Sequence, residues 1–423
     1  MSDPVTVNEE APTAGRRLRR LFGSVYAPIS AGTIATGMLI PVLPLYLAEI
    51  GLTLRTTSVV LAAAGLGAAL AGLPVGSLLA RHGERSVMIG ALAVIAMAVA
   101  ALGLTDTAIA LVALRLGGGS AGAALRLSRQ TYITRTVDDA TRGRAMAWIG
   151  GSFRISLFVG PLLGGLIADR VGFTAAFAVA GALSALGLVP AVLSRPAPAR
   201  QDPRPHVDGE VSTATTSADP VHVGRPNEGV VTAVRTHRRI LLRAGPVFLM
   251  VMTVREGRFV VVPLIGDELG LGPAEVGALV TVGTAADLLL FPVSGWLMDA
   301  HGRLAAMVPS FGIIAIGLVV LGLATSATAA VVAGAVIGIG NGLGSGVMLT
   351  FGSDLAPSDS PGPFLAALAV TQDAGKIVGP LLVGAVGATA GLGAASITLG
   401  VAMFLTIAWL VRGIGETHQP SVA

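Results

Sequence analysis

The sequence contains no cysteine and unusually little charge. Only 12% of its 423 residues are Asp, Glu, Lys or Arg, and only 4% are aromatic. Without cysteine the chain has no structural disulfide, thiolate zinc site or cysteine nucleophile. A soluble domain carries about 25% charged residues, so a chain with half that share lacks the polar groups to cover a water-facing surface. The composition therefore excludes a soluble globular protein.

The residues present in excess are apolar. Hydrophobic residues make up 53% of the chain, and 57 glycines add to them. A membrane-spanning helix needs about 20 mostly apolar residues. Apolar runs predict twelve such spans, at residues 22–48, 57–80, 86–104, 107–128, 145–166, 172–193, 244–265, 276–298, 304–325, 327–352, 364–388 and 392–411. The expected fold is an all-α membrane protein.

Basic residues are distributed unevenly around these spans. If the N-terminus is inside, the inner loops and tails hold 20 of the 28 Lys and Arg residues, and the outer loops hold only Arg55 and Arg170. Cytoplasmic loops of membrane proteins carry such a positive excess. We therefore expect a multi-pass protein of the cell (plasma) membrane with both termini in the cytoplasm. The net charge of +4 then reflects topology and does not indicate nucleic-acid binding.

Polar stretches suggest the domain boundaries. Residues 195–242 are too polar to bury a core and are predicted to be a cytoplasmic linker. The apolar run that follows Arg16–Arg20 is much longer than the apolar region of a signal peptide, so it is interpreted as the first span. The expected organisation is a disordered basic tail, two six-helix halves joined by the linker, and a second cytoplasmic tail, at residues 1–21, 22–194, 195–242, 243–413 and 414–423.

The two halves resemble each other when the second is aligned on the first at one constant offset. Pro44-Leu45 falls on Pro263-Leu264, and Gly160-Pro161-Leu162-Leu163 falls on Gly379-Pro380-Leu381-Leu382. At the same offset three further glycines fall on glycines, namely Gly51 on Gly270, Gly76 on Gly295 and Gly83 on Gly302. Parallel repeats of six helices, with the site near the midplane between them, are an established plan for transporters.

Several short motifs carry a family resemblance. Span 2 is followed by Gly76-Ser77-Leu78-Leu79-Ala80-Arg81-His82-Gly83-Glu84-Arg85, and Arg115 in span 4 precedes Gly119 by four residues. Span 5 contains Gly160-Pro161-Leu162-Leu163-Gly164-Gly165, and span 1 contains Pro41-Val42-Leu43-Pro44-Leu45-Tyr46. Together they resemble the gate, proton-coupling and antiporter motifs of the major facilitator superfamily, in particular its twelve-span drug:proton antiporters. The first gate motif departs from the family pattern, with Ala80 at the position of its acid.

The resemblance implies the major facilitator fold, with twelve transmembrane helices in two pseudo-symmetric six-helix halves, and a role for Arg115 in proton coupling. Charges in the inner loops are expected to bridge the halves as a latch, or else to act only as topology anchors. The Gly-Pro pairs are expected to let helices bend, or else to shape static packing. The gating and hinge candidates are Gly76, Arg81, Gly83, Arg85, Gly160, Pro161, Gly164, Gly165, Asp299, Arg303, Gly379 and Pro380.

Nine charged residues fall within the predicted spans: Arg115, Arg126, Arg154, Arg255, Glu256, Arg258, Asp287, Asp373 and Lys376. An ionised side chain at mid-bilayer costs about 2.5–3.5 kcal/mol on insertion scales, so each is a functional candidate by default. Spans 3, 6, 9 and 12 have none, and the family fold places them at the lipid-facing periphery. Arg126 lies near an inner helix end and is expected to reach the headgroups.

The proton-coupling candidates are Asp373, Glu256, Asp287, Arg115 and Arg154. Asp373 and Lys376 are three residues apart on one helix and can pair, and the repeat offset places Arg154 opposite Asp373. A carboxylate shared by two cations binds a proton less readily, and separation restores its affinity. Two alternatives remain: a fixed bridge between Asp373 and Arg154 that only holds the halves together, and a role for Asp287 in hydrating a cavity.

The expected substrate cavity is rich in cations. The nine intramembrane charges sum to a net +3, which favours an anionic, zwitterionic or neutral amphiphilic substrate over a permanent cation. The cavity candidates are Arg255, Arg258, Lys376, Gln372 and Asn341.

The sequence gives little support to other functions. It has no phosphate-binding loop of the type G-x-x-x-x-G-K-[ST], and its six histidines lack metal-ligand spacing. We therefore expect a monomeric transporter in the lipid bilayer that moves a small molecule, not an enzyme, with no cofactor, metal, ATP or nucleic acid. The leading hypothesis is a proton antiporter exporting small amphiphilic molecules. The alternatives are a proton-coupled symporter importing an organic anion, and a membrane sensor or scaffold without flux.

Overall fold

The computed structural model describes residues 27–136, 139–193, 230–358 and 360–417 of the 423. The predicted tail at residues 1–21 and most of the predicted linker lie outside the described residues. Every regular element in the described ranges is a helix: α2 (Ala27–Glu49), α3 (Leu54–Leu102), α4 (Ala108–Thr136), α5 (Asp139–Val171), α6 (Phe173–Leu186), α7 (Leu188–Leu193), α8 (Val230–Thr236), α9 (Arg238–Glu268), α10 (Pro273–His301), α11 (Arg303–Gly322), α12 (Ala327–Leu343), α13 (Val347–Leu355), α14 (Pro361–Ala390) and α15 (Leu392–Gly413).

These helices account for the twelve predicted spans and confirm the fold class, with three differences in detail. Spans 2 and 3 run together as α3, which bends at Gly83, where φ is 74°. Span 6 is interrupted at Gly187 between α6 and α7, and span 10 is broken between α12 and α13, where Gly346 has φ 80°. The range assigned to the linker also contains α8 and the first turn of α9.

Nine segments within the described residues are long and apolar enough to cross a membrane. For two of the remaining spans, the structure shows why they are not among these nine segments. The helix of span 6 is short, since α6 has 14 residues. Helix α9 carries Arg255, Glu256 and Arg258 in its middle. The three charges that make α9 a poor membrane span by composition are the same charges that make its residues functional candidates.

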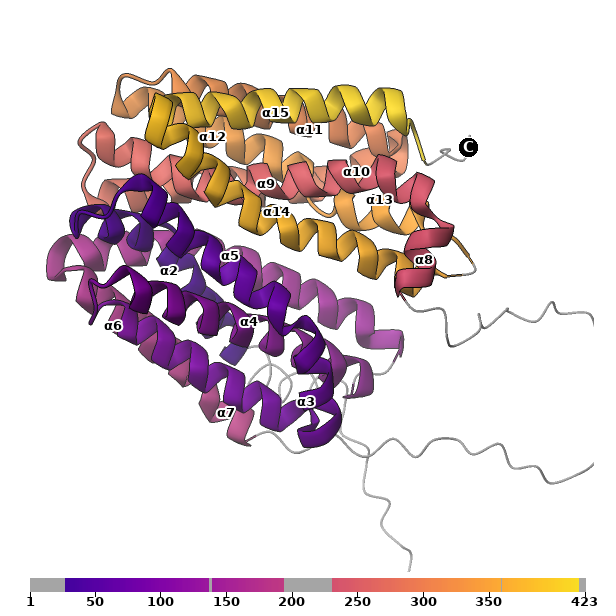
Figure 1. The fold of residues 1–423 in the computed structure, drawn as a ribbon, viewed down its shortest axis with the longest axis horizontal. Helices are drawn as coiled ribbons and strands as arrows, with labels where there is room; N and C mark the ends of the chain where they lie inside the picture. The colour runs from indigo at the N-terminus through magenta and orange to yellow at the C-terminus, as the bar shows by residue number, and fades with distance from the viewer. Residues whose placement is uncertain (1–26, 137–138, 194–229, 359, 418–423) are drawn as a thin grey trace, which may run out of the picture.

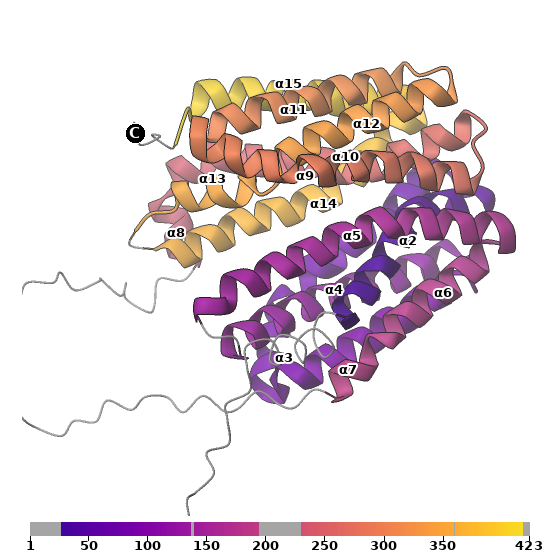
Figure 2. The ribbon, with the colours of Figure 1, turned by 180° about the vertical axis from the view of Figure 1, so that it is seen from behind.

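The helices form two halves that lie side by side, α2 to α7 in one and α8 to α15 in the other (Figures 1 and 2). The halves approach each other at the end where α2, α5, α9 and α14 finish, and diverge toward the end that carries α8 and the C-terminus. Across the interface α3 packs against α14, α5 against α10, and α2 against α9. Helices α6, α11 and α15 pack against helices of their own half, which agrees with the absence of charges in spans 6, 9 and 12.

The backbone supports the internal repeat. A φ in the left-handed region favours glycine, because a Cβ clashes there. Glycines that the repeat offset brings together share this conformation in three places: Gly51 and Gly270 (75° and 80°), Gly83 and Gly302 (74° and 94°), and Gly172 and Gly391 (101° and 89°). The first two pairs were matched on sequence, and the structure adds the third. The chain therefore turns in the same way at these three equivalent places in the two halves.

Close helix contacts also repeat. A Cβ added at Gly119 of α4 would clash with the carbonyl oxygen of Ala64 on α3. At the equivalent place a Cβ on Gly338 of α12 would clash with the carbonyl oxygen of Gly283 on α10. Glycine allows these backbones to approach, which stabilises helix pairs where no hydrophobic driving force acts between helices in lipid.

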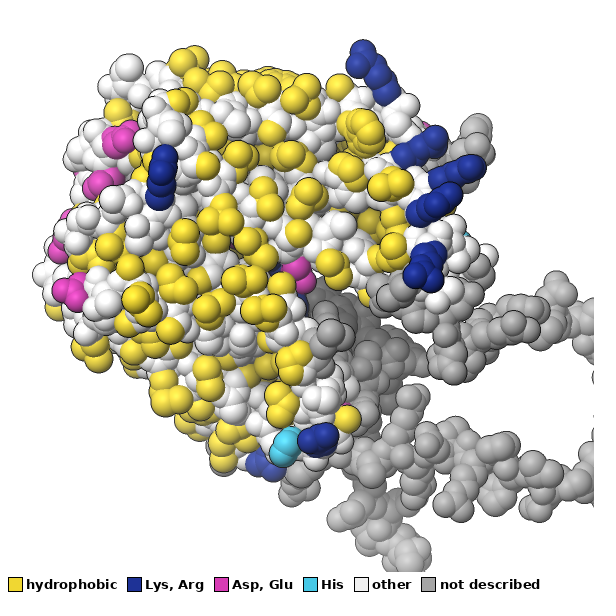
Figure 3. All heavy atoms as spheres, in the orientation of Figure 1, with side chains coloured by type: hydrophobic (Ala, Val, Ile, Leu, Met, Phe, Trp, Pro, Cys, Tyr) yellow, Lys and Arg dark blue, Asp and Glu magenta, His cyan; other side chains and the backbone are white. Residues whose placement is uncertain are grey.

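Charged side chains gather at opposite ends of the molecule. Figure 3 shows Lys and Arg clustered at the end that carries α8 and the C-terminus, and Asp and Glu at the other end. The basic group includes Arg238, Arg239 and Arg243 at the start of α9, and all three are exposed. This distribution is the one from which the orientation in the membrane was predicted.

Candidate functional site

A cavity of about 420 Å³ lies between the two halves. Eight helices from both halves line it, with two or more residues each from α2, α5 and α9 and one residue each from α3, α4, α10, α12 and α14. Its lining residues are Thr36, Leu39, Ile40, Leu43 and Pro44 of α2; Leu61 of α3; Arg115 of α4; Arg154 and Leu157 of α5; Met252, Arg255, Glu256, Arg258, Phe259 and Val260 of α9; Asp287 of α10; Asn341, Ser345 and Gly346 at and just beyond the end of α12; and Pro380 of α14. This volume is in the range of small-molecule sites.

The two long walls of the cavity differ in character. Helix α2 contributes Leu39, Ile40 and Leu43, whereas α9 contributes three charged groups. Helix periodicity explains the charged wall, because residues three apart, such as Arg255 and Arg258, lie on the same face of a helix. The cavity is therefore amphiphilic, apolar along α2 and charged along α9, and Arg115 and Arg154 add positive charge from the N-terminal half.

Asp287 is the centre of a network that joins the halves. Its Oδ1 accepts a hydrogen bond from Nη1 of Arg154 at 2.9 Å and one from Oγ of Ser345 at 3.1 Å. Its Oδ2 accepts one from Nδ2 of Asn341 at 2.7 Å. The Arg154 guanidinium also lies over the ring of Phe291, 4.1 Å from its centroid. Both side chains of the ion pair are largely buried, although both residues line the cavity.

The predicted opposition of Arg154 and Asp373 is wrong in this structure. Arg154 lies on α5, and α5 packs against α10 across the interface. Asp373 lies on α14, and α14 packs against α3. The repeat offset relates equivalent positions within the halves, and equivalent positions do not have to face each other. Asp287 on α10 is therefore the partner of Arg154. From the sequence, Asp287 was a proton-coupling candidate, with hydration of a cavity as the alternative role.

Glu256 is the other carboxylate of the cavity, and its environment differs. The ion pairs found among the described residues involve other groups, so Glu256 has no ion-pair partner there. Four cations act on it electrostatically, namely Lys376, Arg258, Arg115 and Arg255. Its backbone position is fixed by helix packing, since a Cβ on Gly379 would meet the Cβ of Glu256 at 3.2 Å.

The predicted pair on α14 is confirmed, but it lies off the cavity wall. Nζ of Lys376 donates to Oδ1 of Asp373 at 2.6 Å, with about a quarter of each side chain exposed. Neither residue lines the cavity, and neither does Gln372, although Lys376 and Gln372 were expected there. Of the five cavity candidates, the structure places Arg255, Arg258 and Asn341 on the wall.

Apart from Arg154, the cavity arginines have few partners within the described residues. Arg255 donates from Nη2 to the carbonyl oxygen of Gly344 at 3.2 Å, and the Arg258 guanidinium lies over the ring of Phe259 at 4.7 Å. The Nε atoms of Arg115, Arg255 and Arg258 are buried and have no hydrogen-bond acceptor.

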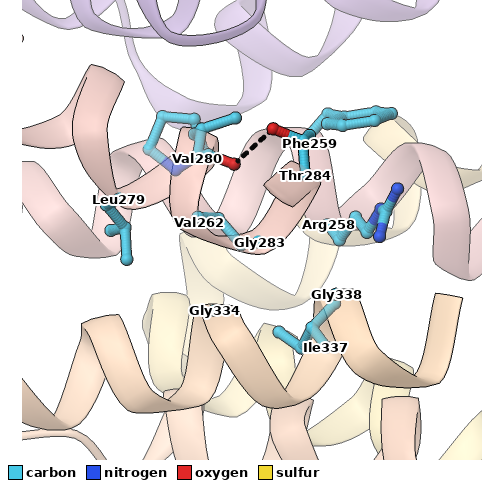
Figure 4. A pocket seen from close by; sticks show the side chains of 11 residues that line it. Arg258, Phe259, Val262, Leu279, Val280, Gly283, Thr284, Gly334, Ile337 and Gly338 are labelled. Carbon is cyan, nitrogen blue, oxygen red and sulfur yellow. Dashed lines mark hydrogen bonds between the residues drawn. The ribbon is translucent and has the colours of Figure 1, made fainter. Parts of the chain in front are cut away.

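A smaller pocket of about 30 Å³ adjoins the cavity between α9, α10 and α12 (Figure 4). Arg258 and Phe259 line both spaces, and apart from Thr284 the remaining wall is apolar or glycine, with Leu279 and Ile337 facing the pocket. Thr284 does not offer its hydroxyl proton to the pocket, because it donates to the carbonyl oxygens of Val280 and Thr281 at 3.3 and 3.0 Å. Arg258 thus lies between a charged space and an apolar one.

Within the described residues, Arg85 and Arg303 of the predicted latch bond inside their own halves. Nε of Arg303 donates to Oδ2 of Asp354 at 2.7 Å, within the C-terminal half. Arg85 donates to the carbonyl oxygens of Ala191 and Val192 on α7, within the N-terminal half. Arg81 and Asp299 are exposed. The halves diverge at this end, so the predicted latch is not formed in the described residues.

The glycines of the expected hinges are contact points between helices. A Cβ on Gly160 would meet Cα of Gly37 on α2 at 2.7 Å, and one on Gly164 would meet the carbonyl oxygen of Met38 at 2.8 Å. A Cβ on Gly165 would clash with the carbonyl oxygen of Pro273 on the other half. Helices α5 and α14 continue through Pro161 and Pro380. A Cβ on Gly76, by contrast, would enter open space.

Several participating residues were not singled out from the sequence. Ser345 and Phe291 are ordinary residues for a membrane helix and give no signal by themselves. Asp354 and Glu416 lie near the predicted inner end, where charges are expected in any case. The Glu416 carboxylate accepts from the backbone N–H groups of Arg303 and Leu304, both at 2.8 Å, and thereby caps the start of α11.

Comparison with known proteins agrees with this architecture. The family model described as Major Facilitator Superfamily matches the chain twice, over residues 29–255 and 246–422. An uncharacterized MFS-type transporter of Mycobacterium tuberculosis, Rv1877, is 26% identical over 211 residues, which are 47% of this chain and 30% of that protein. The inner membrane transport protein YajR of Escherichia coli is 30% identical over 185 residues, 43% of this chain and 39% of that protein. The chain thus spans well under half the length of these relatives.

Solved structures share the fold at low sequence identity. The human organic anion transporter MFSD10 (TETRAN) is similar with a TM-score of 0.63 and 17% identity, covering 93% of this chain and 99% of that one. A bacterial homolog of the human lysosomal transporter Spinster is similar with a TM-score of 0.69 and 15% identity, covering 95% and 96%. Two matches of the family model, one over each half of a twelve-span helical fold, identify this chain as a member of the Major Facilitator Superfamily of membrane transporters.

Proposed function

We propose that this multi-pass membrane transporter exports small amphiphilic molecules, as in drug or metabolite efflux, in exchange for protons. The observation that carries the proposal is Glu256, a carboxylate on the wall of the central cavity without an ion-pair partner in the described residues. A proton carrier has to be reachable from the cavity and free to gain and lose a proton. Asp373 was the first candidate from the sequence, but it is paired with Lys376 off the cavity wall.

The amphiphilic walls support the substrate class. A molecule with an apolar body can lie against Leu39, Ile40 and Leu43 of α2 while its polar end faces α9. A substrate group that donates a hydrogen bond to Glu256 competes with a proton for the same oxygen atoms. Such competition is the condition for exchange, because substrate and proton then occupy the site in turn.

Alternating access requires contacts that form and break between the halves. The Arg154–Asp287 pair is such a contact, since α5 and α10 belong to different halves. With both termini in the cytoplasm, as the positive charge at that end favours, this conformation opens inward. We propose that the chain works as a monomer in the plasma membrane, because both cavity walls come from one chain, and that a proton gradient rather than ATP drives it.

The test uses everted vesicles with a preformed pH gradient. Deoxycholate, norfloxacin and ethidium serve as anionic, zwitterionic and cationic amphiphiles, and a transported compound should dissipate the gradient when it is added. Glu256→Gln should abolish this response, whereas Asp373→Asn, which removes a carboxylate off the cavity wall, should retain it. If Glu256→Gln behaves like the wild type, the assignment of the proton carrier is wrong.

A second candidate is a proton-coupled symporter that imports an organic anion. It is favoured by the cavity's four arginines, which outnumber its two carboxylates. An anion held by arginines and a proton on Glu256 would then bind together. Accumulation of a labelled organic anion in intact cells, driven by an inward proton gradient, would support import over export, and absence of flux in liposomes would contradict both.

A further inference from the structure

Three guanidinium donors of the central cavity have no acceptor in the described part of the chain. They are the buried Nε atoms of Arg115, Arg255 and Arg258, and they come from α4 in one half and α9 in the other. A buried donor without a partner is destabilising, and the great majority of such groups in native proteins find one. Three such donors in one cavity indicate a ligand that supplies the acceptors.

The protein's own anions do not satisfy these arginines. Asp287 already accepts from Arg154, Asn341 and Ser345. Glu256 is the other carboxylate on the wall, and it forms no ion pair in the described residues. Once the paired Arg154 and Asp287 are set aside, three positive charges face one negative charge. The cavity therefore carries a net charge of about +2 that a ligand can neutralise in part.

The donors are arginines, and this selects the chemistry of the ligand. A guanidinium offers up to five N–H donors in a planar fork that matches the two oxygen atoms of a carboxylate, or those of a sulfonate or phosphonate. The wall formed by Leu39, Ile40 and Leu43 of α2 and Leu61 of α3 offers no charge to such a ligand. That wall suits an apolar body.

We propose that the central cavity binds organic acids, with the oxyanion held by Arg115, Arg255 and Arg258 and the apolar body against α2. This rests on the proposed function only in taking the central cavity as the substrate site, and it holds for either direction of transport. Because the three arginines come from both halves, an acid bound to them also joins the halves, in addition to the Arg154–Asp287 pair.

The test measures equilibrium binding to the full-length chain in detergent, without any gradient. Matched compounds share one body and differ in one group: phenylbutyrate, its amide and phenylbutylamine; naphthoate, its amide and naphthylmethylamine; octanoate, its amide and octylamine. At constant ionic strength at least one acid should bind about tenfold or more tightly than its amide and amine, as loss of a charged hydrogen bond predicts. If no acid is preferred with any of the three bodies, whether or not the compounds bind, the proposal is wrong.

Variants then assign the preference to the arginines. Arg255→Gln and Arg258→Gln should each reduce the preference for the acid over its amide by about tenfold, whereas Arg243→Gln, an exposed position on the same helix, should leave it unchanged. Arg258→Lys keeps the charge but loses Nε and should fall between the wild type and Arg258→Gln. An acid preference that survives both glutamine variants would contradict the assignment. Binding needs no proton gradient, so this proposal and the proposed function can fail independently. If Glu256→Gln no longer dissipates the pH gradient but still binds acids, the acid site is distinct from the proton carrier.

Discussion

The ion pair between Arg154 and Asp287 should contribute more to stability than the pair between Asp373 and Lys376. The first pair joins two halves of the protein, its side chains are 20% and 11% exposed, and Asp287 also receives hydrogen bonds from Asn341 and Ser345. The second pair lies three residues apart on a single helix, with side chains 25% and 24% exposed. Coupling energies between contacting groups of one network reach about 0.5–3 kcal/mol, whereas pairs on one helix contribute about 0.2–0.5 kcal/mol.

Two double-mutant cycles measure this difference. One combines Arg154→Gln with Asp287→Asn, and the other combines Lys376→Gln with Asp373→Asn. The free energy of unfolding is obtained from denaturant titrations in mixed micelles. We expect a coupling energy of about 1–2 kcal/mol for the first cycle and at most about 0.5 kcal/mol for the second. The double variant of the first pair should be more stable than the two single losses predict, since it leaves no unpaired charge.

The comparison is internal, because both pairs lie in the same protein and detergent. Equal coupling energies in the two cycles would refute the reasoning that the network around Asp287 holds the halves together. A larger coupling energy for the pair on α14 would refute it as well, and would restore Asp373 as the main intramembrane contact.

The glycine contacts and the cap of α11 give three further predictions. Gly119→Ala should lower the free energy of unfolding by about 1–3 kcal/mol, because its added methyl group would clash with a carbonyl oxygen of α3. Gly122→Ala, whose Cβ enters open space, should leave the free energy of unfolding unchanged. Denaturant titration of both variants decides this. Gly165→Ala should disfavour the contact between α5 and α10. A single cysteine introduced at Thr36 of this cysteine-free chain should then be labelled faster from the side on which these helices meet. Gly122→Ala is the control, and an unchanged labelling rate in Gly165→Ala would contradict the prediction. Glu416→Ala removes two hydrogen bonds to the start of α11 and should cost about 0.5–2 kcal/mol, and equal stability of this variant and the wild type would show that the cap is dispensable.

Apolar length and the repeat were sufficient for the fold. The twelve spans follow from hydropathy, since a bilayer requires about 20 apolar residues per helix whatever their partners. The constant offset between the halves located equivalent turns, because a left-handed glycine such as Gly51 or Gly270 is required wherever the chain turns in the same way. The candidates on α9 were also found from the sequence, since intramembrane charges are rare enough to stand out.

The pairing of those charges could not be obtained in the same way. Asp373 and Lys376 were paired correctly because three residues on a helix fix their separation. Arg154 was assigned to Asp373 by the repeat and pairs with Asp287, because the choice depends on which helices meet across the interface. The same limit applies to the inner-loop charges, whose partners depend on the conformation in which the halves rest.

The sequence by itself determined that this protein is a membrane transporter built from two related halves, and which few charges lie inside the membrane. Composition, span length and repeat are properties of the chain alone, so they can be read without a fold. Only the tertiary structure decided that Glu256 faces a cavity without an ion-pair partner in the described residues, while Asp287 is bonded to Arg154, Asn341 and Ser345. The rotation of each helix about its axis and the choice of its neighbour determine which charges face one another, and these depend on packing across the whole molecule.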